Sequence, residues 1–141
     1  MSDEAIEGML GTYADAVRSN DVDRFVALYD DDVRVFDLWE RWSYDGADAW
    51  RQMVGEWFGS LGSEQVAVEF ADVQTVVGDD VAAVQAFVTF KGLSAEGEEL
   101  RAISNRLTWA LRKTPEGGWR VVHEHTSAPV DFETGKVRLQ R

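Results

Sequence analysis

The chain has no cysteine and only two prolines among its 141 residues. The absence of cysteine excludes disulfide bonds, a thiolate nucleophile and a thiolate-ligated zinc site. No apolar run approaches the roughly 20 residues of a membrane-spanning helix. The first residues, MSDEA, lack the basic and apolar regions of a secretory signal. We therefore expect a cytoplasmic protein that has no membrane partner.

Basic residues are scarce, with 14 Lys and Arg against 26 Asp and Glu, and the formal net charge is −12. Nucleic-acid binding is not expected, because it depends on neutralising phosphates. Apolar residues make up 45% of the chain, which predicts one folded domain over residues 1–141. Six tryptophans are more than packing alone requires, since a buried indole N–H needs a partner, and they indicate a cavity or an interface.

Three stretches have apolar residues at helical spacing. They are residues 3–19, a shorter helix that begins after Asn20 or Asp21 and includes Tyr29, and residues 46–58. In the third stretch, the apolar stripe that contains Trp57 is interpreted as core in preference to ligand lining. The acidic run Asp30 to Asp32 is interpreted as a solvated loop, because no regular Ca²⁺-loop spacing follows it.

Strand patterns occupy residues 33–39, 65–77, 81–91, 105–113 and 119–127, with turn signals at 78–80 and 114–118. The charged tail is expected to be an edge strand or an arm. Helices grouped before a strand meander predict an α+β fold, in which a curved antiparallel sheet wraps the helices.

The order of four motifs resembles the nuclear transport factor 2-like superfamily. The motifs are SNDVD at 19–23, YDDDVRVF at 29–36, DGADAW at 45–50 and WRVVHEHTS at 119–127. This superfamily includes ketosteroid isomerase, the SnoaL-like polyketide cyclases and the association domain of calcium/calmodulin-dependent protein kinase II. The resemblance covers about residues 4–129 and leaves 130–141 as a C-terminal extension. It implies a cone-shaped, cystatin-like sheet around three N-terminal helices, with a pocket on its concave face.

By similarity to ketosteroid isomerase, three residues are candidates for catalysis. Asp37 stands at the general-base position, and Tyr13 stands at the position of the oxyanion-hole tyrosine. Asn105 falls about where the isomerase has a protonated aspartic acid, and its amide is a weaker donor. Two alternatives stay open: Tyr13 could be a packed wall residue, and Asp37 could cap a loop or pair with a nearby arginine.

The resemblance also implies a set of ligand-binding residues that face into the pocket. A buried Glu124 would be either an acid with a raised pKa or half of an ion pair. The positions at which the kinase domain carries arginines hold Trp109 and Thr126 here, which favours a neutral ligand. No cofactor and no metal are expected. The predicted ligand-binding residues are Trp39, Trp50, Trp109, Glu124 and Thr126.

Alternation along the last strand places Val121, His123 and His125 on one face of the sheet, and the resemblance implies that this is the outer face. A shared face would allow the two histidines to bind a metal, but no third ligand is near, so we interpret them as interface residues. The convex face commonly makes a dimer in the superfamily, and we expect a homodimer through these residues.

Two functions remain open from the sequence. The first is a SnoaL-like protein that binds a neutral, partly aromatic small molecule, as an isomerase or cyclase that transfers a proton next to a carbonyl. The second is a non-catalytic dimerisation or association module with a vestigial pocket.

Overall fold

A computed structural model describes residues 2–141, so Met1 lies outside the described chain. Within residues 2–141, three helices and the strand β1 come early and four long strands follow, as the sequence predicted, and a two-residue strand, β2, is added before the third helix. No helix within residues 2–141 is long and apolar enough to cross a membrane. The elements in order are α1 (Ser2–Ser19), α2 (Val22–Val26), β1 (Tyr29–Phe36), β2 (Tyr44–Asp45), α3 (Ala47–Gly59), β3 (Gln65–Val77), β4 (Val81–Leu93), β5 (Glu99–Lys113) and β6 (Trp119–Ser127).

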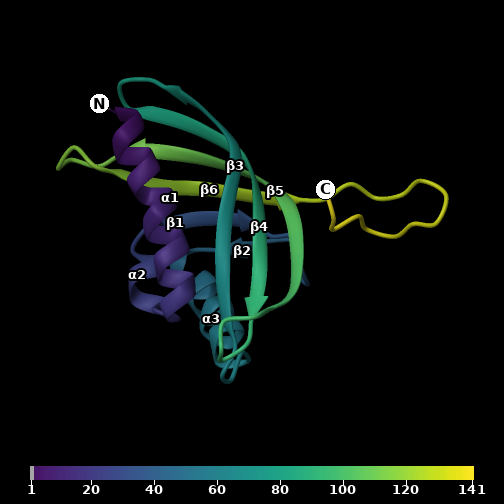
Figure 1. The fold of residues 1–141 in the computed structure, drawn as a ribbon. Helices are drawn as coiled ribbons and strands as arrows, with labels where there is room; N and C mark the ends of the chain where they lie inside the picture. The colour runs from purple at the N-terminus through teal and green to yellow at the C-terminus, as the bar shows by residue number, and fades with distance from the viewer. Residues whose placement is uncertain (1) are drawn as a thin grey trace.

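The six strands form one sheet in the order β2-β1-β6-β5-β4-β3. The sheet curves around the helices, and α1 lies along its concave side (Figure 1). The α+β prediction is therefore confirmed. One pairing departs from the predicted antiparallel sheet, because β1 runs parallel to β6 and the sheet is mixed. The two strands are far apart in the chain, so no turn signal between them announces the pairing.

The N-terminal part of the sheet begins earlier than predicted. Asp21 caps α2 by accepting a hydrogen bond from the Arg24 amide at 3.0 Å, as expected. The helix ends at Val26, however, and Tyr29 is the first residue of β1. The acidic run after Tyr29 is thus an irregular stretch of strand, and the prediction of a loop is wrong there.

Two strands extend beyond the predicted patterns. Tyr44 and Asp45 form β2 and pair with β1, although this segment lies outside the predicted strand patterns. The strand β5 begins at Glu99, well before the predicted start at Asn105. Both of these strand segments form because they pair with a neighbouring strand, β2 with β1 and the start of β5 with β4. The local sequence does not predict either pairing.

The prediction for Val121 is wrong, because this side chain is fully buried in the core. A β-bulge shifts the register between β5 and β6, so that Ala110 pairs with His123 but Leu111 pairs with Val121. The extra residue, Val122, restores Val121 to the inner face. His123 and His125 stay on the outer face with Phe36.

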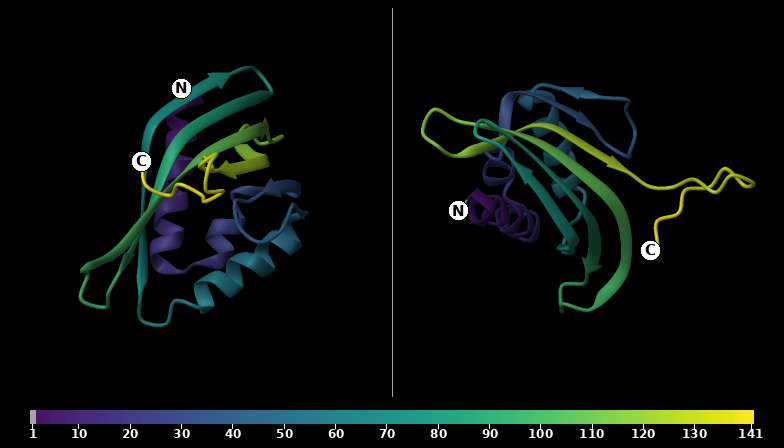
Figure 2. Two further views of the ribbon diagram at one scale, coloured as in Figure 1. Left: turned by 90° about the vertical axis from the view of Figure 1, so that its right-hand side faces the viewer. Right: turned by 90° about the horizontal axis from the view of Figure 1, so that it is seen from above.

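The C-terminal extension is an arm that projects away from the sheet and then returns to it (Figure 2). Val130 and Val137 form an isolated bridge within the arm. The returning end is held at β5, where the Ser104 amide donates to the Leu139 carbonyl at 2.6 Å. The Arg141 guanidinium lies 3.8 Å from the centre of the Phe87 ring. The tail is therefore an arm rather than an edge strand.

Gly46 occupies a backbone conformation that only glycine adopts readily. It precedes α3 with φ 93° and ψ 155°. We expect Gly46→Ala to lower the free energy of unfolding by about 1–3 kcal/mol. Gly55→Ala is the matched control, since Gly55 is inside α3 and a methyl group there meets nothing within 4 Å. It should raise the free energy of unfolding by about 0.5–1 kcal/mol. Urea denaturation measures both changes, and equal effects would contradict the assignment of strain to Gly46.

Candidate functional site

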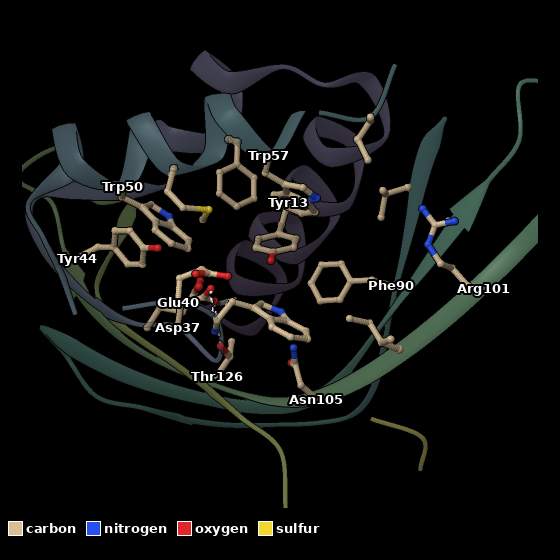
Figure 3. A pocket seen from close by; sticks show the side chains of 18 residues that line it. Tyr13, Asp37, Glu40, Tyr44, Trp50, Trp57, Phe90, Arg101, Asn105 and Thr126 are labelled. Carbon is tan, nitrogen blue, oxygen red and sulfur yellow. Dashed lines mark hydrogen bonds between the residues drawn. The ribbon is translucent and has the colours of Figure 1, made fainter. Parts of the chain in front are cut away.

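A cavity of about 410 Å³ lies between α3, the inner face of α1 and the concave face of the sheet (Figure 3). Its volume falls within the range of small-molecule sites, which is about 300–1,000 Å³. Most of its wall is aromatic, and its acidic groups are Asp37, Glu40 and Glu124. The aromatic lining residues are Tyr13, Phe25, Trp39, Tyr44, Trp50, Trp57 and Phe90.

Asp37 lies in the cavity wall just after β1, and a hydroxyl group holds its carboxylate in place. The Thr126 hydroxyl donates to Asp37 Oδ1 at 3.1 Å and accepts from the Leu38 amide at 2.8 Å (Figure 3). The Trp39 amide lies 3.4 Å from Oδ2. Burial raises the pKa of Asp37 above its ordinary value, and these hydrogen bonds oppose part of the rise.

None of the arginines considered as partners of Asp37 pairs with it in the described chain. Arg34 pairs with Asp45 at 3.2 Å, and Arg51 pairs with Asp23 at 2.5 Å. Arg41 lies over the ring of Tyr44, 5.4 Å from its centre. The carboxylate therefore faces the cavity without a cationic partner.

Glu124 is the most deeply buried acid of the site, with 1% of its surface exposed. Its Oε1 accepts a hydrogen bond from the Tyr29 hydroxyl at 2.5 Å and another from Trp109 Nε1 at 2.8 Å. Burial raises the pKa of Glu124 to about 7, the two donors oppose the rise, and the charge of Asp37 adds to it. Of the two states left open by the sequence, Glu124 is the acid with a raised pKa.

Tyr13 and Asn105 face the same cavity from opposite sides, one from α1 and one from β5 (Figure 3). Burial raises the pKa of Tyr13 well above its ordinary value, and the charges of Glu124 and Asp37 raise it further. The phenol therefore stays protonated and can donate. Asn105 is buried, and its Oδ1 has no hydrogen-bond partner among residues 2–141. Because Oδ1 can only accept, the donor that this amide can offer to a ligand is Nδ2.

The predicted tryptophans separate into two groups. Trp39 and Trp50 line the cavity, whereas Trp109 lies behind the wall, where it donates to Glu124 and its ring lies 6.1 Å from that of Tyr13. Trp57, which the sequence favoured as core, also lines the cavity. Trp42, which had no predicted role, is 98% exposed.

Sequence reasoning missed several lining residues. Ile103 and Arg101 precede Asn105 at intervals of two on β5, so alternation along a longer strand would have found them. Phe90 pairs with Ile103 across the sheet. Tyr44 reaches the cavity wall because β2 pairs with β1, and the local sequence does not predict this pairing.

Arg101 is a cation at the rim of the cavity, across from the acidic groups (Figure 3). Its guanidinium donates to Glu64 at 2.7 Å. A methyl group on Gly92 would come within 3.3 Å of its Cζ, so the absence of a side chain at this position makes room for the arginine. Within residues 2–141, no group of three or more His, Cys, Asp or Glu residues could hold a metal ion.

The sequence profile of the SnoaL-like domain matches residues 6–131, which is most of the chain. The chain belongs to the SnoaL-like domain family. A similar solved structure is an NTF2-like protein of unknown function from Pseudomonas putida KT2440. It has 26% identity and a TM-score of 0.84, and the match covers 99% of this chain and 94% of that one.

More distant structures share the fold of this SnoaL-like chain. A putative calcium/calmodulin-dependent protein kinase II association domain from Xanthomonas campestris has 15% identity and a TM-score of 0.73, over 88% of this chain and 85% of that one. A putative aromatic ring hydroxylase from Novosphingobium aromaticivorans has 21% identity and a TM-score of 0.68, over 89% and 87%. No protein with a curated function matches the chain. The resemblance to the nuclear transport factor 2-like superfamily is thus confirmed.

The burial of Glu124 predicts a specific dependence of stability on pH. The folded state keeps the proton up to about pH 7, whereas the unfolded chain releases it near 4.5. The free energy of unfolding should therefore fall as the pH rises through this window, by about 3 kcal/mol, and then level off. Urea denaturation at about pH 5, 6 and 8 measures the slope.

Glu124→Gln is the matched control for this slope. Its amide oxygen can accept the hydrogen bonds of Tyr29 and Trp109, but the side chain does not titrate. The variant should lose most of the slope and keep the smaller part that the raised pKa of Asp37 contributes. An unchanged slope would contradict the assignment.

Proposed function

We propose that this SnoaL-like protein binds a neutral, partly aromatic small molecule and transfers a proton next to a carbonyl group, as an isomerase or cyclase. The observation that carries the proposal is the carboxylate of Asp37, which has no cationic partner among the described residues and lies in the wall of an aromatic cavity. A base in such a site must be ionised yet basic, and burial raises its pKa in that direction.

The developing enolate needs donors that are already in place. The Tyr13 phenol remains protonated because its pKa is raised, and Asn105 lines the cavity with an amide whose Nδ2 can donate. Stacking on Trp39, Trp50 and Trp57 would hold a flat ligand between the base and the donors. Neither a cofactor nor a metal takes part in this scheme.

Phenols imitate an enolate, and their binding tests the proposal. Tryptophan fluorescence should report micromolar or tighter binding of a phenolate series to the wild type. Asp37→Asn should tighten phenolate binding about tenfold, because it removes a negative charge beside the bound anion. Asp79→Asn removes the same charge from the exposed β3–β4 turn and should leave the affinity unchanged.

Two results would overturn this assignment. One is an Asp37→Asn variant that binds phenolates no better than Asp79→Asn does. The other is a wild type that binds no phenol, which would favour the alternative function, a non-catalytic association module.

One observation on the outer face supports an association role beside the cavity. The Phe36 ring lies 4.8 Å from His123 and 5.6 Å from His125, and the Arg34 guanidinium lies 4.9 Å from the same ring. We propose that residues 1–141 act as one domain that forms a homodimer through this face. Val121 takes no part, because it is buried in the core.

The double variant His123→Ala, His125→Ala tests the interface. Sedimentation velocity should show a dimer for the wild type and at least a tenfold weaker association for the variant. Thermal unfolding at concentrations below dissociation should be little changed, since both rings lie on the outer face. A monomeric wild type, or a variant that dimerises equally well, would contradict this interface.

A further inference from the structure

The two histidines of the chain lie side by side on the outer face of the sheet, and the proposed cavity chemistry uses neither. His123 and His125 are two residues apart on β6, and their ring centres are 6.2 Å apart. The ring of Phe36 on the neighbouring strand β1 contacts both imidazoles edge on. Zinc takes four ligands in structural sites, and two neighbouring imidazoles supply half of them.

A hydrogen bond determines which nitrogen His123 offers to a ligand. Its Nδ1 lies 2.7 Å from the carbonyl oxygen of Arg34. A carbonyl oxygen can only accept, so Nδ1 carries the hydrogen, and in the neutral ring Nε2 carries the lone pair. Histidines that bind metals almost always donate their other N–H to a carbonyl, a carboxylate or a water, which orients the ring toward the ion. The backbone of β1 therefore holds His123 in a tautomer that suits a metal.

His125 offers a second nitrogen from the same face. Its side chain is exposed and makes no hydrogen bond within residues 2–141, so the ring is free to rotate. Zn–N bonds are about 2.0–2.1 Å long, which places the centres of two imidazole rings on one tetrahedral ion roughly 5–6 Å apart. The observed 6.2 Å is close to this spacing, and a small rotation of His125 is sufficient to reach it.

The positive charge of Arg34, which lies beside the two histidines, has its own partner. The guanidinium is 4.9 Å from the centre of the Phe36 ring and pairs with Asp45 at 3.2 Å. Because opposite charges this close offset each other, Asp45 reduces the repulsion between Arg34 and a bound cation.

Toward β5 and β4, small uncharged side chains flank the two histidines. Ala110 pairs with His123, Thr108 pairs with His125, and Ala83 pairs with Ala110 on the next strand. Sheets that pack face to face lie about 10 Å apart, and small side chains allow this approach. In a two-fold dimer both copies present the same surface. Imidazoles from the two copies can then reach one ion between the sheets.

We propose that a zinc ion binds between two copies of this chain, held by His123 and His125 of each copy. One chain is not sufficient, because within residues 2–141 no third ligand completes a metal site. Imidazole suits zinc, whereas magnesium and calcium prefer oxygen ligands. Each chain has a formal net charge of −12, so a cation between two copies also lowers their repulsion. This inference rests on the proposed homodimer and adds the ion that joins its halves.

The test uses the full chain without a histidine tag, since its only imidazoles are then those of this site. Equilibrium dialysis should find about one zinc ion for every two chains. Sedimentation velocity should show self-association that is at least about tenfold tighter in zinc than in EDTA, because an ion that binds only the dimer stabilises it. Magnesium should have no such effect.

His123→Ala and His125→Ala, made singly and together, each remove at least two of the four ligands. Every one of these variants should lose the response to zinc. Thr108→Ala is the matched control, because it changes the neighbour of His125 and keeps all four imidazoles, and it should respond as the wild type does. Equal unfolding temperatures in EDTA would show that the variants are folded.

Cobalt(II) distinguishes this site from the acidic surface of the chain. It absorbs visible light strongly in a tetrahedral site and weakly among the six oxygen ligands that carboxylates and water provide. Strong absorption that appears with the wild type and with Thr108→Ala, and is absent from the double histidine variant, is the expected result.

The outcomes separate this inference from the proposed homodimer. Equally tight dimers in zinc and in EDTA would overturn the zinc site and leave the homodimer standing. A zinc response that survives in the double histidine variant would assign the ion to acidic side chains and overturn the site as well. A wild type that is monomeric in both conditions would overturn both proposals. Phenol binding beside Asp37 is independent of these results, because the cavity lies on the opposite face of the sheet.

Discussion

The hydrogen bonds to Glu124 are the interaction on which the cavity depends. They join three strands, since Tyr29 belongs to β1, Trp109 to β5 and Glu124 to β6. A carboxyl group that is 1% exposed can remain in the interior because two donors bond its Oε1 and because its pKa, raised to about 7, favours the neutral form below that pH. This part of the cavity wall is therefore held together by hydrogen bonds between three strands.

The two inward carboxyl groups differ in environment more than in type. Asp37 directly follows β1, where a hydroxyl and a backbone amide support its ionised form. Glu124 lies deeper, and within residues 2–141 its hydrogen bonds end at Oε1. Burial raises the pKa of both groups, to about 7 for Glu124. In this SnoaL-like protein, the difference between the two carboxyl groups follows from how deeply each one is buried and from the donors around it.

Much of the fold was predictable because its periodicities are local. Helical spacing grouped Tyr13 with the apolar face of α1, and alternation along β5 grouped Asn105 with Trp109 on one face, which the family resemblance identified as the inner one. Failures arose where pairing between distant segments decides the structure. The bulge that returns Val121 to the core and the pairing that brings Tyr44 to the cavity have no signature in the neighbouring residues. The role of Trp57 as a cavity-lining residue was missed because helical spacing of apolar residues does not distinguish a face that packs in the core from a face that lines a cavity.

The sequence by itself determined the element order, the α+β class and the residues that share one face of a helix or strand, because this spacing is fixed by backbone geometry. It also carried the motifs of the family resemblance, and that resemblance implied the inward direction of Asp37, Asn105 and Glu124. Only the tertiary structure decided the state of Glu124 and the separation of Trp109 from the cavity wall. A pKa depends on burial and on the donors that surround the group, and here those donors come from strands that meet only when the whole sheet has formed.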